Sequence, residues 1–149
     1  MPGSAVTVLP LTDLYVMGRD QDHDIRRGVA DAHFLAGHGV NCSLSTNNVL
    51  NPVTPYGDCS LIRMANLYAN VLQKGRAEEL GECFSMLTRR SARLLNHRDY
   101  GIAIGNPADI AVIDAQSPEA AIAEIRPPLA VWKRGRRTVT RHPPELIKP

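Results

Sequence analysis

Two short apolar segments on either side of one helical stretch constrain most strongly how this chain folds. Residues 5–10 and 40–46 each resemble a short strand, and continuous apolar runs of this length are typical of strands covered on both faces. Between them, apolar residues recur with helical spacing from Ile25 to Ala36, after a polar, turn-prone stretch. A strand, a helix and a second strand predict a βαβ unit with parallel strands.

Such a unit is incomplete as a sheet. Two parallel strands leave backbone N–H and C=O groups unpaired along both edges, and an independent α/β domain needs more strands. The sequence therefore predicts a piece that belongs to, or completes, a larger sheet or barrel.

Helices follow a proline-containing loop that spans residues 47–57. The apolar spacing predicts a helix capped by Asp58 and closed by Gly75. Two more helices are expected at residues 77–87 and 89–95, with Thr88 as the cap of the second.

The pattern changes near residue 103, so we divide the chain into residues 1–103 and 104–149. The second part begins with an apolar strand at residues 110–113 and continues with a charged, alanine-rich connector. Two further strands, 129–133 and 138–140, enclose Gly135 and predict a hairpin. A proline-rich tail ends the chain.

Composition excludes several classes of protein. A net charge of +2 gives no reason to expect a nucleic-acid partner, and the basic run Lys133–Arg137 is interpreted as a solvated turn. Cys42, Cys59 and Cys83 are widely spaced, which argues against a disulfide framework or a structural zinc site. The sequence has no apolar stretch of about 18 residues, so no membrane span is predicted, and no signal peptide is visible. The expected location is the cytoplasm.

Eight segments of the chain carry a resemblance to one known family. The loop after the second strand contains two adjacent asparagines and then Asn51-Pro52. The other segments are Pro10-Leu11, Gly18-Arg19, Gly39-Val40-Asn41, Ser91–Asn96, Asp99-Tyr100-Gly101, Gly105–Ile110 and Val131–Arg136. Together they resemble metal-dependent amidohydrolases of the cytosine deaminase and N-isopropylammelide amidohydrolase branch, and the loop with the asparagines is similar to the family's eighth barrel strand and loop.

This resemblance implies an α/β fold: the C-terminal fragment of a (β/α)8 TIM-like barrel, about its last two βα units, plus part of a small β-sandwich domain. It also implies a parent activity, the metal-dependent hydrolysis of C–N bonds other than peptide bonds in a cyclic amidine or pyrimidine-like small molecule. Zinc or iron is the metal of the parent family, where an aspartate that ends the eighth strand takes a proton from the bound water.

The sequence departs from the family at this strand end. Asn47 stands at the position of the metal-binding aspartate, and an amide cannot accept a proton at neutral pH. Asn48 and Asn51 stand at two further acidic positions and are candidate substrate-binding residues. Asp13 and Arg19 follow the first strand, where barrel loops meet substrate, and are candidates as well.

These departures leave open whether this chain is an enzyme. Its five histidines form no metal-binding motif and are interpreted as surface or cap residues, so we expect no cofactor. The first hypothesis is a truncated or split hydrolase that is inactive alone, and whose barrel a separate protein with the missing half could restore. The alternative is a non-catalytic, self-associating or ligand-binding remnant, with a homo-oligomer as its assembly.

Overall fold

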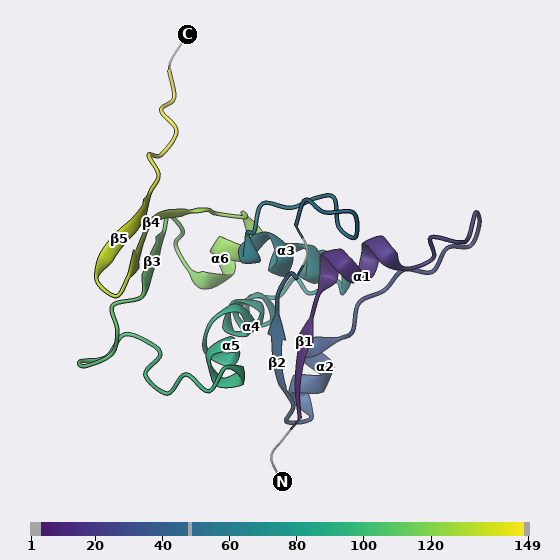
Figure 1. Cartoon of the computed structure of the whole chain (residues 1–149), viewed down its shortest axis with the longest axis horizontal. Helices are drawn as coiled ribbons and strands as arrows, with labels where there is room; N and C mark the ends of the chain where they lie inside the picture. Colours follow the sequence, from purple (N-terminus) through teal and green to yellow (C-terminus); the bar gives the residue numbers. More distant parts are fainter. Residues whose placement is uncertain (1–3, 48, 148–149) are drawn as a thin grey trace.

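The computed structural model of the chain describes residues 4–47 and 49–147. A parallel strand pair, a group of helices and an antiparallel sheet follow one another along this mixed α/β chain (Figure 1). The strands are β1 (Ala5–Val8), β2 (Asn41–Leu44), β3 (Ile110–Ile113), β4 (Pro128–Lys133) and β5 (Arg136–Thr140). The helices are α1 (Pro10–Val16), α2 (Ala32–Gly37), α3 (Leu61–Val71), α4 (Ala77–Leu87), α5 (Arg89–Leu94) and α6 (Pro118–Ala123).

β1 and β2 pair in parallel, which confirms the pairing predicted from the two apolar segments. Thr7 lies opposite Ser43 in the register, and their hydroxyl oxygens are 2.8 Å apart. Val8 and Leu44 follow these residues and point to the opposite face of the pair, because successive side chains of a strand alternate; both belong to the buried core. The pair therefore has one polar line of contact and one apolar face.

The connection between β1 and β2 differs from the prediction. α1 begins directly after β1, where a loop was expected, because Pro10 supplies a backbone angle suited to a first helical turn. The predicted helix from Ile25 to Ala36 is wrong in its first half, since α2 starts only at Ala32. Asp31 sets this start, because its Oδ1 accepts a hydrogen bond from the Phe34 N–H at 3.0 Å.

A polar cluster beneath α2 ties this start to the helices behind it. The second oxygen of Asp31 accepts from Lys74 Nζ at 3.1 Å, and the Tyr68 hydroxyl lies 2.9 Å from His33 Nδ1. His33 Nε2 in turn lies 3.0 Å from the Glu79 carbonyl oxygen, so this histidine is half-buried and structural rather than a surface residue.

The acidity of this cluster follows from its surroundings. Burial alone would raise the pKa of the Asp31 carboxyl, but hydrogen bonds from backbone N–H groups and from Lys74 outweigh burial and hold that pKa below its ordinary value. Burial raises the pKa of the fully buried Tyr68, which therefore acts as a neutral hydrogen-bonding group.

The three helices after the loop occur where the sequence predicts them, with different caps. Ser60 rather than Asp58 caps α3, because the Ser60 hydroxyl accepts from the Arg63 N–H at 3.3 Å. Asp58 instead accepts from the Ser60 N–H at 3.0 Å. Thr88 precedes α5 but does not cap it, since its hydroxyl donates back to the Phe84 carbonyl at 2.8 Å.

One buried cluster joins the strand pair to the helices. β1 and β2 contribute one side of this core, and α2, α3, α4 and α6 contribute the other. Its buried members are Val8, Ala32, Cys42, Leu44, Ala65, Tyr68, Ala69, Cys83, Met86 and Ile122.

α6 forms within the charged, alanine-rich connector, to which the sequence analysis assigned no helix or strand. The Ser117 hydroxyl caps it by accepting from the Ala120 N–H at 3.2 Å. Ile122 is fully buried, and its carbonyl accepts from Asn66 Nδ2 of α3 at 3.0 Å. The division near residue 103 stays a prediction, and α6 packs back across it.

β3, β4 and β5 form an antiparallel sheet in that order. The predicted hairpin around Gly135 is confirmed, with Arg134 at φ 48° and Gly135 at φ 76°. Positive φ at both central residues is the signature of a two-residue type I′ turn. β5 begins at Arg136, two residues earlier than predicted.

The described residues contain no helix long and apolar enough to cross a membrane. All three cysteines have free thiols, with Cys42 and Cys83 buried and Cys59 exposed. Burial raises the pKa of Cys83 to about 12, which makes this thiol a packing residue rather than a nucleophile.

Gln73 gives a test of how α3 ends. It has φ 54° and is followed by a hydrogen bond from the Lys74 N–H to the Ala69 carbonyl at 2.8 Å, the arrangement that favours glycine after a helix. Gln73→Gly should therefore raise the free energy of unfolding by roughly 0.5–1 kcal/mol, measured by urea denaturation. Gly75→Ala is the control, because its φ is not positive and a Cβ there meets nothing within 4 Å. A larger loss from Gly75→Ala than gain from Gln73→Gly would contradict this helix end.

Candidate functional site

The carboxyl ends of β1 and β2 lie side by side at the upper end of the parallel pair in Figure 1. Thr12, on α1, donates a hydrogen bond from its hydroxyl to Asn47 Oδ1 at 3.0 Å. Asn47 therefore lies at the end of β2, facing the segment that follows β1. Carboxyl ends of parallel strands are where α/β proteins place their ligands, so this contact defines the candidate site. Asn48 lies outside the described residues.

Asn51 organises the loop between β2 and α3. Its Oδ1 accepts hydrogen bonds from the Val53 N–H at 3.0 Å and from the Thr54 N–H at 2.9 Å, which is the geometry of an Asx turn. Thr54 is fully buried, and its hydroxyl lies 3.4 Å from that of Thr12. The Asn51 side-chain oxygen thus shapes the loop that stands over the candidate site.

Asp13 and Arg19 lie farther along the segment that follows β1. Asp13 is a half-buried residue in the first turn of α1, where a carboxylate interacts favourably with the helix dipole. Arg19 follows α1 and lies over the ring of Tyr15, with its guanidinium carbon 5.1 Å from the ring centroid. Tyr15 also contacts Tyr56 of the loop after β2 edge to face, with centroids 5.7 Å apart.

The structure thus brings together Asn47 and the loop that Asn51 shapes, and it attaches Arg19 through two tyrosines. Sequence reasoning missed Thr12, Thr54, Tyr15 and Tyr56. The criterion that selected Asp13 also applies to Thr12, because both residues follow the first strand. No sequence pattern indicated Tyr15 and Tyr56, since only the folded loops bring them into contact.

The chemistry of the strand ends is neutral. Asn47 offers an amide oxygen and an amide N–H group, which bind by hydrogen bonds but do not take up a proton at neutral pH. Among the described residues, no group of three or more His, Cys, Asp or Glu side chains could hold a metal ion. What these residues can do is donate and accept hydrogen bonds without a change of charge.

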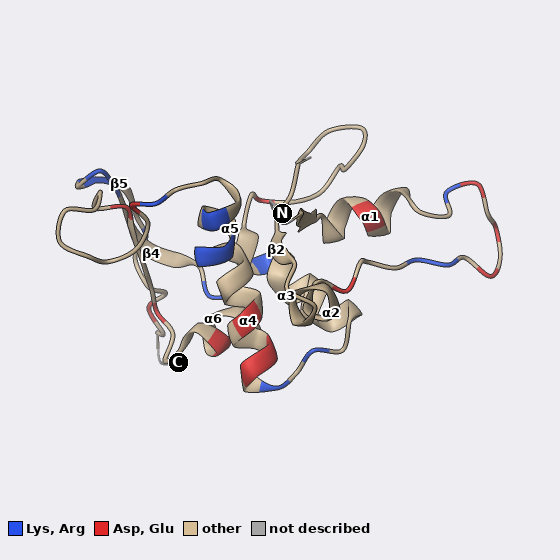
Figure 2. Cartoon of the chain, turned by 90° about the horizontal axis from the view of Figure 1, so that it is seen from below, with Lys and Arg blue, Asp and Glu red and all other residues tan. Residues whose placement is uncertain are grey.

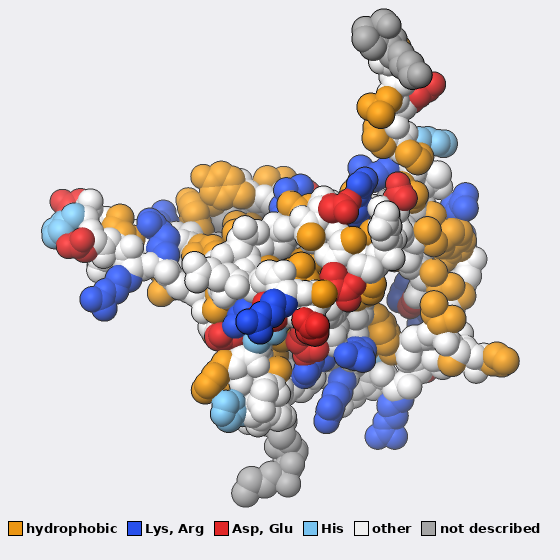
Figure 3. All heavy atoms as spheres, turned by 180° about the vertical axis from the view of Figure 1, so that it is seen from behind, with side chains coloured by type: hydrophobic (Ala, Val, Ile, Leu, Met, Phe, Trp, Pro, Cys, Tyr) orange, Lys and Arg blue, Asp and Glu red, His pale blue; other side chains and the backbone are white. Residues whose placement is uncertain are grey.

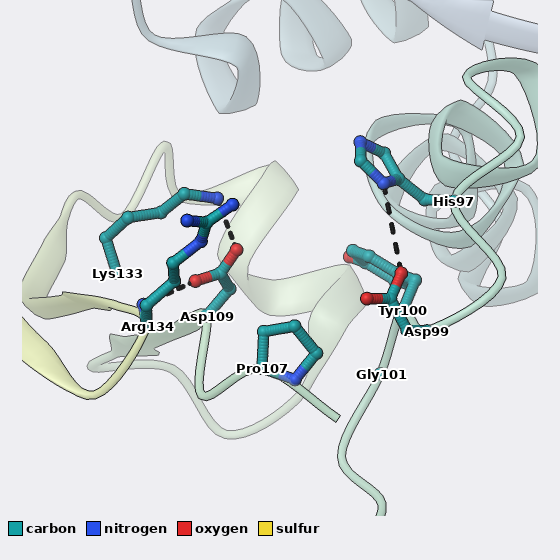
Figure 4. Close-up of a pocket in the computed structure, with 8 residues that line it drawn as sticks. All are labelled: His97, Asp99, Tyr100, Gly101, Pro107, Asp109, Lys133 and Arg134. Carbon is teal, nitrogen blue, oxygen red and sulfur yellow. Dashed lines mark hydrogen bonds and ion pairs between the residues drawn. The ribbon is translucent and has the colours of Figure 1, made fainter. Parts of the chain in front are cut away.

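Away from the strand ends, a hollow of about 230 Å³ lies between the turn after α5 and the β4–β5 hairpin (Figure 4). Asp109 occupies one side of it. Its carboxylate forms an ion pair with Lys133 and accepts from the Arg134 N–H at 2.7 Å. Lys133, and then the Arg134 N–H, hold the pKa of Asp109 below its ordinary value. Asp109 therefore fastens the hairpin turn to the start of β3.

Comparison with known families gives a match along most of the chain. The model described as "Amidohydrolase family" matches residues 2–139. N-isopropylammelide isopropyl amidohydrolase of Pseudomonas sp. (strain ADP) is 30% identical over 99 residues, covering 66% of this chain and 25% of that protein. Pterin deaminase of Rhizobium rhizogenes is 28% identical over 116 residues, covering 76% of this chain and 26% of that protein.

Solved structures show the same fold over nearly the whole chain. The 5-methylcytosine deaminase from Klebsiella pneumoniae, liganded with 5-fluorocytosine, superposes with a TM-score of 0.89 at 24% identity, covering 97% of this chain and 35% of that one. The atrazine chlorohydrolase from Arthrobacter aurescens TC1 complexed with zinc gives 0.62 at 20% identity, covering 98% and 33%. This chain therefore spans about a quarter to a third of the length of these proteins.

Thr12 gives a test of the contact between the two strand ends. Thr12→Val keeps the shape of the side chain but removes the hydroxyl that donates to Asn47. The free energy of unfolding should fall by about 0.5–1.5 kcal/mol, and amide hydrogen exchange should become faster in residues 49–56. Thr140→Val, at an exposed position of β5, is the matched control. Unchanged exchange in that loop would contradict the assignment.

Asp109 predicts how the antiparallel sheet responds to acid. A carboxyl with a lowered folded-state pKa contributes stability that is complete above its ordinary value of 3.8 and is lost as the pH falls through the lowered value. The fluorescence of Trp132, the single tryptophan, should report this loss on β4. In Asp109→Asn the sheet should be weaker near neutral pH and should lack this acid-dependent step. Identical pH profiles for the two proteins would show that the ion pair with Lys133 does not stabilise the sheet.

Proposed function

The chain belongs to the amidohydrolase family, and from this premise we propose that it forms the last two βα units of a (β/α)8 barrel and part of its small β-sandwich domain. The activity proposed for the complete barrel is hydrolysis of a C–N bond other than a peptide bond. Support for the barrel comes from the parallel β1–β2 pair and from the superposition on the deaminase. Support for the sandwich comes from the β3–β4–β5 sheet.

The proposed substrate is a small nitrogen-containing ring, a cyclic amidine or a pyrimidine-like molecule. The relatives and the similar structure are named for N-isopropylammelide, pterin and 5-methylcytosine, and each of these is a nitrogen heterocycle. The observation that carries the proposal is the position of Asn47, which Thr12 holds at 3.0 Å at the carboxyl end of β2. Barrels of this class bind their substrates at this end.

We further propose that Asn47 stands where the family has its metal-binding aspartate, with Asn48 and Asn51 at the neighbouring acidic positions. Zinc or iron is the metal proposed for the parent family, and one of the similar structures is complexed with zinc. The residues of this chain do not fit such a centre, because the Asn47 oxygen belongs to a neutral amide that accepts from Thr12.

A consequence is that the chain does not hydrolyse the ring by itself. General-base catalysis contributes roughly 10²–10⁴-fold to a rate, and an amide in that position cannot supply it. The proposed role of Asn47, with Asp13 and Arg19 on the neighbouring segment, is to bind and orient the ring.

The proposed partner is the set of strands that completes the barrel, supplied by the same polypeptide or by another one. Within the described residues, β1 and β2 pair only with each other, so the outer edges of the pair offer backbone groups to further strands. Self-association through these edges is the alternative form of partner.

A chimaera tests the proposed role of Asn47. This chain would replace the superposed third of the 5-methylcytosine deaminase, once with Asn47 and once with Asn47→Asp, and release of ammonia from 5-methylcytosine would be measured. The chimaera with Asn47 should bind the ring and turn it over slowly. Asn47→Asp should raise kcat by roughly 10²-fold or more and leave KM nearly unchanged.

Two controls keep the result interpretable. Thermal unfolding of both chimaeras should agree closely, because a carboxylate accepts the Thr12 hydrogen bond as an amide does. Asparagine and aspartate would also be compared at the superposed position of the intact deaminase, in case a chimaera does not fold. Equal turnover with the two residues in both settings would sink the proposal.

A further inference from the structure

We propose that the hollow beside α5, lined by Arg89, Arg93, Arg98 and Tyr100, binds a small phosphorylated ligand that carries a planar ring, of about mononucleotide size. This site is independent of the proposed function. α5 lies next to the opposite end of β2 from Asn47, because Asn41 Nδ2 at the start of that strand donates to the Arg90 carbonyl at 3.0 Å.

The spacing of the arginines sorts them onto two faces. Arg89 and Arg93 are four residues apart, so a helix places them on one face, and both line the hollow. Arg90 follows Arg89 directly, so its side chain leaves α5 on a different face. It is half-buried and forms an ion pair with Glu82 of α4. The charge of Arg90 is therefore matched inside the fold, while the other face of α5 keeps its positive charge.

The end of α5 turns the following residues back toward this face. Asn96 has φ 58°, and the His97 N–H donates to the Ala92 carbonyl at 2.9 Å, which together form a Schellman-type helix end. This reversal brings Arg98 and Tyr100 to the same hollow as Arg89 and Arg93. Residues ten or so apart in sequence thus share one cavity.

The positive charge of the hollow is not balanced by its own lining. No Asp or Glu is among the residues that line it. Within the described part of the chain, neither Arg93 nor Arg98 lies within ion-pair distance of a carboxylate. Arg89 donates from Nε to the Ser85 hydroxyl at 2.7 Å, which orients its guanidinium without neutralising it.

The charge pattern is visible on the molecule. Figure 2 shows broad blue bands on α5 and red bands on the neighbouring α4. Figure 3, which shows the molecule from behind, has Lys and Arg side chains along the lower edge to the right of centre, a region that corresponds to the lower left of Figure 1, where α5 lies. The hollow in Figure 4 adjoins this one and shares His97 and Tyr100 with it, but its lining also contains Asp99 and Asp109, so its charge is mixed.

The ligand class follows from these groups. A guanidinium presents a planar set of N–H donors that matches the oxygens of a phosphate. The three guanidinium groups of this hollow suit a phosphate with two negative charges. Tyr100 is 49% exposed and offers its ring for stacking beside the arginines. A hollow of about 300 Å³ is at the small end for ligand pockets, which fits a mononucleotide and not a polymer.

Calorimetric titration of the whole chain tests this site with three probes: adenosine 5′-monophosphate, inorganic phosphate and adenosine. The monophosphate should bind with the highest affinity, inorganic phosphate should bind more weakly, and adenosine should bind at least about 10-fold more weakly than the monophosphate. Raising the salt concentration should weaken binding of both phosphates, because the arginines are exposed. Absence of monophosphate binding at low salt would overturn the proposal.

Variants assign the binding to these residues. Arg93→Gln and Arg98→Gln should each weaken monophosphate binding about 10-fold. The matched control, Arg136→Gln on the exposed strand β5, should change it less than about twofold. Tyr100→Leu should remove the preference for the monophosphate over inorganic phosphate. Equal effects of Arg136→Gln and Arg93→Gln would show diffuse charge attraction and overturn the site, and an unchanged preference in Tyr100→Leu would overturn the role of its ring.

Discussion

A pair of parallel strands requires a connection that carries the chain back to the starting end of the sheet, and the other contacts of the first half of this protein depend on that connection. Here it is made by α1, a long irregular stretch and α2. Asp31 has the central place in this connection, because its side chain caps α2 and also accepts a hydrogen bond from Lys74 Nζ at 3.1 Å. Through Tyr68 and His33 the same cluster reaches α3 and α4, which close the core over β1 and β2.

The connection between β1 and β2 also positions the residues of the candidate site. α1 starts directly after β1 and presents Thr12 to Asn47, while the Asx turn of Asn51 holds the covering loop in place. At Asn47 the position of the side chain and its chemistry point in different directions. The fold delivers a side chain to the end of β2, the kind of position where α/β proteins place their ligands, but an amide there can only donate and accept hydrogen bonds and cannot take up a proton at neutral pH. Exchange of this one residue is therefore more informative than removal of the loop.

Charges far from the strand ends have two distinct uses. Arg90 and Lys133 are matched by Glu82 and Asp109, so they hold elements of the fold together. Arg93 and Arg98 have no such carboxylate among the described residues, and they leave positive charge at one hollow. The sequence shows similar arginine-rich runs in both regions, and only the placement of the acidic side chains separates a structural ion pair from a candidate anion site.

The sequence by itself determined the parallel strands, α4, the strand Ile110–Ile113 and the hairpin around Gly135, together with the family. These features depend on apolar periodicity and turn chemistry within a few residues. α2 and α6 begin at local side-chain caps, Asp31 and Ser117. The tertiary structure alone decided where these two helices are held and brought Thr12 into contact with Asn47. The partners in these contacts lie 35 to 56 residues away, such as Lys74, Tyr68 and Asn66. Local spacing carries no information about such partners, because only the folded chain brings them within hydrogen-bonding distance.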